Sequence, residues 1–193
     1  MQSRVYWMMG GSGSGKSVAA SVMREAGVFV IDADKVAHDV LLSGRGAYDE
    51  VLKTFGNEFL LENGEINRRE LGKYVFANPE KLQILNDITH KHIREEIINL
   101  VSDREVAVVD APLPPEGFIK PYHILYILAP AKVRIERISR RDSITADDAQ
   151  LRLGNQKMID DYIKYADTII ENDGDLSHFK EKIKNWCEYE KII

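Results

Sequence analysis

The chain has 193 residues, 44% hydrophobic and 30% charged, and a formal net charge of −5 at pH 7. This size and composition fit one globular domain, or one core that carries insertions. The acidic balance argues against a dedicated nucleic-acid binder, which needs an extended basic face. The one cysteine, Cys187, excludes an intramolecular disulfide and favours a reducing compartment, so we expect a cytoplasmic protein in which Cys187 packs in a late helix. The apolar runs at the N-terminus and at 124–129 are too short for a secretion signal or a membrane span, so we expect neither.

The first predicted elements surround a glycine-rich loop. Residues 5–9 form an apolar run typical of a buried strand, and residues 18–26 form a good helix that stops at Gly27. Between them, residues 10–17 read Gly-Gly-Ser-Gly-Ser-Gly-Lys-Ser, a complete G-x-x-x-x-G-K-S phosphate-binding loop. Strand, loop and helix in this order predict a nucleoside triphosphate site, because backbone N–H groups and the helix N-terminus attract a polyanion. We expect six residues of the loop to bind the phosphates of ATP: Ser12, Gly13, Ser14, Gly15, Lys16 and Ser17.

A second strand is predicted at 28–31, and it runs into Asp32-Ala33-Asp34. A long helical stretch follows, in which Asn67 can cap one helix and Pro79 sits in the first turn of the longest. The expected helices cover 35–42, 47–55, 68–76 and 78 to about 102. About 70 residues are too many for a simple crossover between strands, so we expect an inserted helical subdomain over the strand ends.

Three further strands are predicted at 106–110, 124–128 and 168–170. Helices are expected at 131–141, at 145 to about 165 with Thr145 as its cap, and from 176 to the end. Continuous apolar strands that alternate with helices predict an α/β fold: a five-stranded parallel sheet with helices on both faces. We expect a core at about 1–34, 104–130 and 166–193, an acceptor-binding insertion at about 35–103, and a lid at about 131–165.

The loop alone does not separate kinases from GTPases or ATPase motors. The chain lacks the Asn-Lys-x-Asp run that reads guanine, and Asp110 is followed by Ala111-Pro112 where a motor usually has a second acidic residue. Arginines crowd the expected lid, at positions 134, 137, 140, 141 and 152. They favour a kinase lid that stabilises the transferring phosphoryl group, and the alternative is a solvated basic helix face.

Beyond the loop, a series of short pieces forms one pattern along the chain: Ile31-Asp32-Ala33-Asp34, Phe55-Gly56, Gly64-Glu65-Ile66-Asn67-Arg68, Leu71, Val75-Phe76, His90, Val109-Asp110-Ala111-Pro112-Leu113, Glu116, Arg137, Arg141-Asp142, Arg152-Leu153, Gln156, Ala166-Asp167 and Asn172. In these pieces the chain resembles the dephospho-CoA kinase family over almost its whole length. The departures are His90-Lys91 for the family's His-Pro, Pro114-Pro115-Glu116 for Leu-Phe-Glu, Met8-Met9 for Leu-Thr, and Asn67 for Asp. None of them touches the phosphate machinery, and they concern the acceptor pocket.

The resemblance implies in-line transfer of the γ-phosphoryl group of ATP to the ribose 3′-hydroxyl of dephospho-CoA. It implies Lys16, Asp34 and Arg141 as catalytic residues, with Asp34 as the base and Arg137 as second choice for the lid arginine. Arg137 and Asn172 would also bind ATP, and Ser17 and Asp110 would hold Mg²⁺, the latter through water. The acceptor would contact Asp34, Arg68, His90, Pro112 and Leu113. The implied partners are ATP and dephospho-CoA, with no nucleic acid or membrane, in a monomer or weak homo-oligomer.

The two aspartates after the second strand can be arranged in more than one way. In an extended segment Asp32 and Asp34 point the same way, so both could face the acceptor. If the helix begins at Ala33, Asp32 becomes its cap and Asp34 remains available as the base, and in a third arrangement both only shape the turn. Two other functions also stay open: a kinase of the same fold for a nucleoside monophosphate or a sugar, and a non-catalytic ATP sensor.

Overall fold

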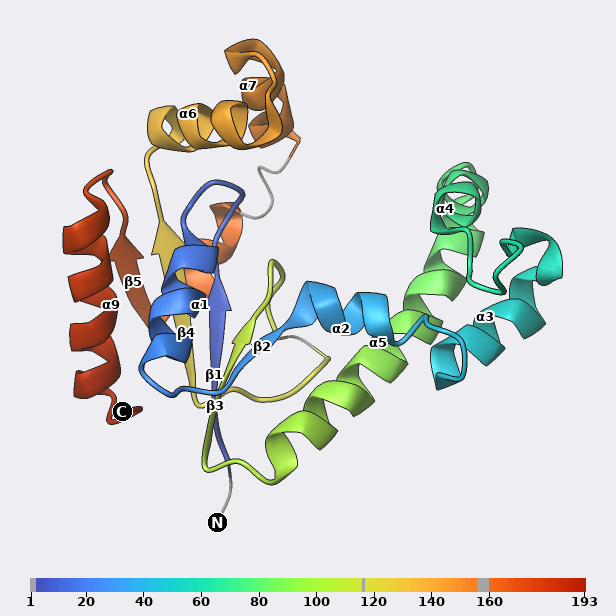
Figure 1. The fold of residues 1–193 in the computed structure, drawn as a ribbon, viewed down its shortest axis with the longest axis horizontal. Helices are drawn as coiled ribbons and strands as arrows, with labels where there is room; N and C mark the ends of the chain where they lie inside the picture. Colours follow the sequence, from blue (N-terminus) through green and yellow to red (C-terminus); the bar gives the residue numbers. More distant parts are fainter. Residues whose placement is uncertain (1–2, 116, 156–159) are drawn as a thin grey trace. The chain divides into compact units, whose positions relative to one another are not determined.

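A five-stranded sheet forms the centre of the computed structural model, which describes residues 3–115, 117–155 and 160–193. The strand order is β2-β3-β1-β4-β5 (Figure 1). Strand β1 pairs in parallel with β3 and with β4, and β4 pairs in parallel with β5, which confirms the predicted parallel sheet. The strands span Arg4–Met9 (β1), Val30–Asp32 (β2), Val106–Asp110 (β3), His123–Leu128 (β4) and Thr168–Glu171 (β5).

The register of the sheet decides which side chains flank the end of β1. Met8 pairs with Asp110 of β3, and Met9 pairs with Tyr126 of β4. Ligands of open parallel sheets bind at the carboxyl ends of the strands. The glycine loop therefore leaves β1 at this edge, with Asp110 next to it.

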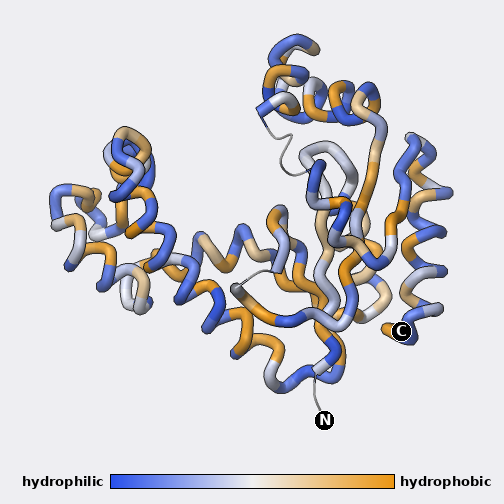
Figure 2. Tube along the Cα trace, turned by 180° about the vertical axis from the view of Figure 1, so that it is seen from behind, coloured by the Kyte–Doolittle hydropathy of each residue, from blue (hydrophilic) through white to orange (hydrophobic). Residues whose placement is uncertain are grey.

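Helices α1 (Lys16–Glu25) and α9 (Leu176–Tyr189) pack together and cover one face of the sheet. Buried side chains of β1 and β4, such as Met8 and Ile127, meet Phe179 and Ile183 of α9 in one hydrophobic cluster. In Figure 2 helix α9 alternates hydrophilic and hydrophobic residues, as expected of a helix with one buried side. Cys187 is buried in this cluster, as predicted.

The segment between β4 and β5 differs from the prediction. Helix α6 spans Ala131–Asp142 and α7 spans Ala146–Gly154, with Thr145 as its cap. The expectation of one helix from 145 to about 165 was wrong: α7 ends at Gly154, and Tyr162–Tyr165 forms the 3-10 helix η2. Glycine is a poor helix former, which favours an end at this point.

The chain divides into two compact units, Met1–Ile31 with Asp103–Ile193 (unit 1) and Asp32–Ser102 (unit 2). In unit 2, α5 packs against α2, α3 and α4. Its elements are α2 (Ala33–Asp39), α3 (Gly46–Phe55), η1 (Asn57–Phe59), α4 (Arg68–Phe76) and α5 (Pro79–Ser102). Helix α2 begins earlier than the predicted 35–42, because Asp32 caps its N-terminus, and it ends at Asp39. No helix in the described ranges is long and apolar enough to cross a membrane.

Candidate active site

The loop from Gly10 to the start of α1 has the backbone of an anion-binding turn. Gly10, Gly13 and Gly15 have positive φ angles of 149°, 76° and 105°. Gly15 directly precedes α1, and its carbonyl accepts the N–H groups of Val18 and Ala19. The free N–H groups of the first turn and the positive end of the helix dipole therefore face the loop. This arrangement is suited to binding phosphate groups.

Lys16, the first residue of α1, places its amino group 3.5 Å from Oδ1 of Asp110 at the end of β3. Both side chains are largely buried, with 20% and 16% of their surface exposed. Ser17, next in α1, is exposed. The hydroxyl of Ser17 and the carboxylate of Asp110 are hard oxygen donors, the type that Mg²⁺ prefers, and Mg²⁺ usually takes few protein ligands beside phosphates and water. Among the described residues, no three or more Asp, Glu, His or Cys side chains lie close enough together to hold a metal ion. A metal centre with several protein ligands is therefore not supported in this part of the chain.

Asn172, which follows β5, and Arg137 of α6 were both predicted to bind ATP. The structure brings both side chains to the loop itself. Nδ2 of Asn172 donates to the carbonyl of Ser14 at 2.8 Å, and its Oδ1 accepts from Nη2 of Arg137 at 2.9 Å. Nη1 of Arg137 donates to the carbonyls of Gly13 and Ser14 at 3.1 and 3.4 Å.

Arg134 also contacts the loop, although the sequence predicted no role for it beyond its place in the arginine run. It is 5% exposed, and its Nε donates to the carbonyl of Ser12 at 2.8 Å. Its Nη1 donates to both carboxylate oxygens of Asp160, at 2.7 and 3.0 Å. Asp160 also bonds to Tyr126, whose pKa is raised to about 12, first by burial and then by this carboxylate. The spacing of Arg134 and Arg137, one helical turn apart, was the available signal for a shared target.

Arg141, the predicted lid arginine, lies further along α6 and is exposed. Its Nε and Nη2 bond to the carboxylate of its neighbour Asp142, at 2.7 and 2.9 Å. Arg152 of α7 bonds to the same carboxylate. These hydrogen bonds, that of Arg141 first, lower the pKa of Asp142 to about 2. Arg141 would therefore have to exchange Asp142 for a phosphoryl group, and its catalytic role stays a prediction.

In unit 2 the two aspartates adopt the capped arrangement. Oδ1 of Asp32 accepts the N–H of Lys35 at 3.0 Å, and α2 begins at Ala33. Asp34 lies exposed in the first turn of α2. This geometry confirms Asp32 as the cap and leaves the carboxylate of Asp34 available to a ligand.

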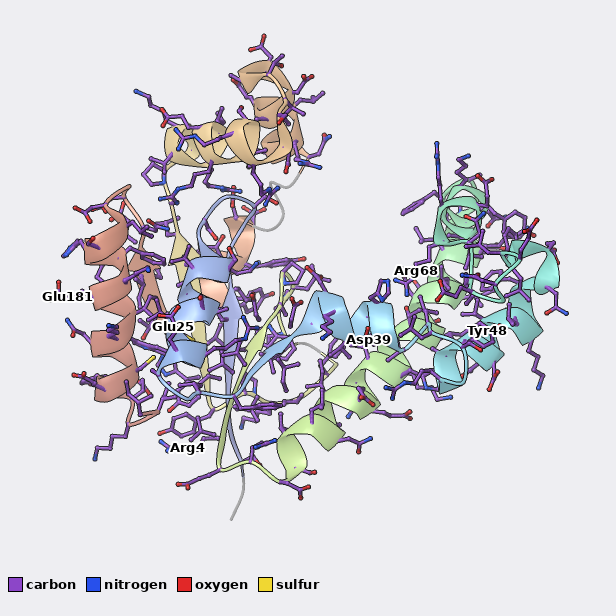
Figure 3. The ribbon with its side chains drawn as sticks, viewed as in Figure 1. Arg4, Glu25, Asp39, Tyr48, Arg68 and Glu181 are labelled. Carbon is purple, nitrogen blue, oxygen red and sulfur yellow. The ribbon has the colours of Figure 1, made fainter. Side chains whose placement is uncertain are left out.

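Arg68 begins α4, directly after its cap Asn67, and its Nη2 donates to the carbonyl of His38 in α2. Burial lowers the pKa of Arg68, against the opposing effects of Glu65 and Asp39, and Figure 3 shows Asp39 near Arg68 within unit 2. A partly buried guanidinium that is available at a helix N-terminus suits an anionic ligand.

The remaining predicted acceptor residues are scattered along the chain. His90 is exposed on α5. In unit 1, Pro112 is half-buried and Leu113 is 45% exposed, and the carbonyl of Leu113 accepts the indole N–H of Trp7 at 2.7 Å. Glu116 and Gln156, which carry part of the resemblance, lie outside the described residues.

The family model and the curated relatives identify the family of this chain. Residues 5–178 match the family model described as dephospho-CoA kinase. A dephospho-CoA kinase of Carboxydothermus hydrogenoformans is 37% identical over 183 residues, which cover 91% of this chain and 89% of that protein. A solved dephospho-CoA kinase from Campylobacter jejuni superposes with a TM-score of 0.71 at 26% identity, and the match covers 97% of this chain and 96% of that chain. The structure of TT1252 from Thermus thermophilus superposes with a TM-score of 0.79 at 25% identity, and the match covers 98% of each chain. The chain therefore belongs to the dephospho-CoA kinase family.

Proposed function

We propose that this protein transfers the γ-phosphoryl group of ATP to the ribose 3′-hydroxyl of dephospho-CoA, giving coenzyme A and ADP. The observation that carries the proposal is the family match over residues 5–178, together with the intact phosphate loop within it. Membership of this family favours a kinase over the ATP sensor, and dephospho-CoA over the nucleotide or sugar acceptors.

On the ATP side, the loop N–H groups of Gly13 and of Gly15 to Ser17 bind the phosphates, and Lys16 leaves Asp110 to pair with the β- and γ-phosphates. The separation of 3.5 Å between Lys16 and Asp110 supports this exchange, because the ammonium is held by a single carboxylate and a triphosphate would offer it a more highly charged partner. A divalent metal, which we propose to be Mg²⁺ held by Ser17 and, through water, by Asp110, would neutralise charge on the phosphate oxygens.

On the acceptor side, Asp34 accepts the proton of the 3′-hydroxyl as the oxygen attacks. The exposed position of Asp34 in the first turn of α2 supports this role. Arg68, with its half-buried guanidinium, binds an anionic part of the acceptor, and His90, Pro112 and Leu113 line its site. Arg141 closes over the transferring group. We further propose that the enzyme is cytoplasmic, which its single, buried cysteine supports, and that it is monomeric or weakly associating.

The departures at His90-Lys91 and Pro114-Pro115 make the acceptor the first point to test. ADP formation should be measured with dephospho-CoA, AMP, shikimate and gluconate in parallel, with the Lys16→Ala variant as the control for contaminating kinases. We expect dephospho-CoA to give a kcat/KM at least about 10³-fold above the others, because a site that binds several substrate groups discriminates strongly. Equal rates with all four acceptors would overturn the assigned substrate.

A further inference from the structure

The carbonyl groups of the phosphate loop are held by side chains from outside the loop. Nε of Arg134 donates to the carbonyl of Ser12 at 2.8 Å, and the far end of the same guanidinium is fixed by both carboxylate oxygens of Asp160. Figure 1 shows α6, which carries Arg134, beside the loop between β1 and α1. A buried, planar group bonded at both ends has little freedom to move.

A second contact holds the loop two residues later. Nδ2 of Asn172 donates to the carbonyl of Ser14 at 2.8 Å, and Arg137 bonds to the other end of the same amide. Nη1 of Arg137 also donates to the carbonyls of Gly13 and Ser14. Asn172 is only 2% exposed. Its amide is thus committed on both sides, to the loop and to Arg137, and little of its surface remains for a ligand.

These contacts determine where the loop N–H groups point. A trans peptide bond is planar, so the carbonyl of one residue and the N–H of the next point in opposite directions. A fixed carbonyl at Ser12 fixes the N–H of Gly13, and a fixed carbonyl at Ser14 fixes the N–H of Gly15. The N–H of Ser14 itself donates to the carbonyl of Gly11 at 3.1 Å. The N–H groups of Gly13 and Gly15 are therefore directed away from the side chains that hold the carbonyls of Ser12 and Ser14.

We propose that Arg134 and Asn172, bridged by Arg137, are positioning residues that preorganise the phosphate loop from behind. They hold its carbonyls so that the N–H groups of Gly13 and Gly15 already face the triphosphate before it binds. Preorganised donors cost no reorganisation when the ligand arrives, which strengthens binding and transition-state stabilisation alike. This inference rests on the proposed function only in requiring that the loop bind a triphosphate. It changes the predicted role of Asn172 from a ligand of ATP to a support of the loop.

The test compares Arg134→Gln and Asn172→Ala with Lys132→Gln, a matched control that removes an exposed positive charge from the same helix. Binding of ATP and of inorganic tripolyphosphate, each with Mg²⁺, should be measured by calorimetry. Both ligands carry the phosphates, but only ATP carries a base and a ribose. We expect both test variants to bind the two ligands about 5- to 50-fold more weakly, by the same factor for each, as for the loss of one buried hydrogen bond. Lys132→Gln should change neither affinity by more than about twofold.

Steady-state kinetics provide a second test, because a general loss of stability would not raise the KM for one substrate alone. The KM for ATP should rise in Arg134→Gln and Asn172→Ala, while the KM for dephospho-CoA stays within about twofold. A variant that weakened ATP but bound tripolyphosphate as the wild type does would show a direct contact with the nucleoside and overturn the inference. Failure of the wild type to bind either ligand would instead overturn the proposed function itself.

A third measurement uses the unaltered protein, in case a variant fails to fold. With ¹⁵N-labelled glycine, the amides of Gly13 and Gly15 should give order parameters of about 0.85 without ligand, equal to those of a rigid backbone. Values below about 0.6 that rise only on ATP binding would overturn preorganisation.

Discussion

The catalytic base can be identified by comparing two carboxylates that lie two residues apart. Asn in place of Asp32 can still accept the N–H of Lys35, now bonded at 3.0 Å, so α2 keeps its cap at a cost of a few tenths of a kcal/mol. Asn in place of Asp34 keeps the size of an exposed first-turn side chain but cannot take a proton. We therefore expect kcat to fall by about 10²–10⁴ in Asp34→Asn, the usual contribution of a general base, and by less than about tenfold in Asp32→Asn.

In free energy, the loss at Asp34 corresponds to about 2.7–5.4 kcal/mol of transition-state stabilisation, at 1.36 kcal/mol for each factor of ten. The assay is ADP formation at saturating ATP and dephospho-CoA. ATP affinity and the melting temperature of each variant serve as controls for binding and folding. Both should change little, since neither substitution removes a buried group or a contact to the loop. A larger loss of kcat at Asp32 than at Asp34 would assign the base to the other carboxylate, and equal small losses would leave neither as the base.

Three further results are expected. Lys16→Ala should remain folded but lose at least about 10³-fold in kcat, because the removed ammonium stabilises charge that develops on the phosphates; a folded variant with unchanged turnover would contradict this. Amide hydrogen exchange across residues 131–165 should slow when ATP and acceptor are both bound, and identical exchange in the free and ternary states would argue for a rigid site in which Arg141 keeps its bond to Asp142. Cys187, whose pKa burial raises to about 11, should react with iodoacetamide at pH 8 far more slowly than a free thiol, and rapid reaction of folded protein would show that this side of α9 opens.

Where local chemistry decides the structure, the sequence predicted it closely. The helix at Arg68–Phe76 was expected with the same ends, because Asn67 is a strong cap. Helix α5 begins at Pro79 for a similar reason, since proline suits the first turn. The third strand was also placed correctly, at Val106–Asp110, by its continuous apolar run.

Tertiary contacts account for what the sequence pattern missed. The second strand was expected at 28–31 but forms at Val30–Asp32, because the N–H of Val28 bonds back to Met23 at the end of α1. The arginines of α6 also contact two different targets, although their helical spacing suggested one shared target. Arg134 and Arg137 turn to the loop, whereas Arg141, one turn later, is bonded to Asp142. Helical periodicity predicts a shared face, but it does not tell a buried loop contact from a surface ion pair.

The contacts behind the loop give a second reason for its glycines, at a free position of the phosphate motif and at a fixed one. Residue 11 is a free position in the motif, yet a Cβ there would lie 2.3 Å from Nη2 of Arg134, a distance that real side chains do not tolerate. At Gly15, a fixed position, a Cβ would lie 2.2 Å from Nδ2 of Asn172, in addition to the strain of a φ of 105°. The loop is therefore glycine-rich on two accounts. The backbone must approach the phosphates on one side, and on the other it must approach the arginine and the asparagine that hold it in place.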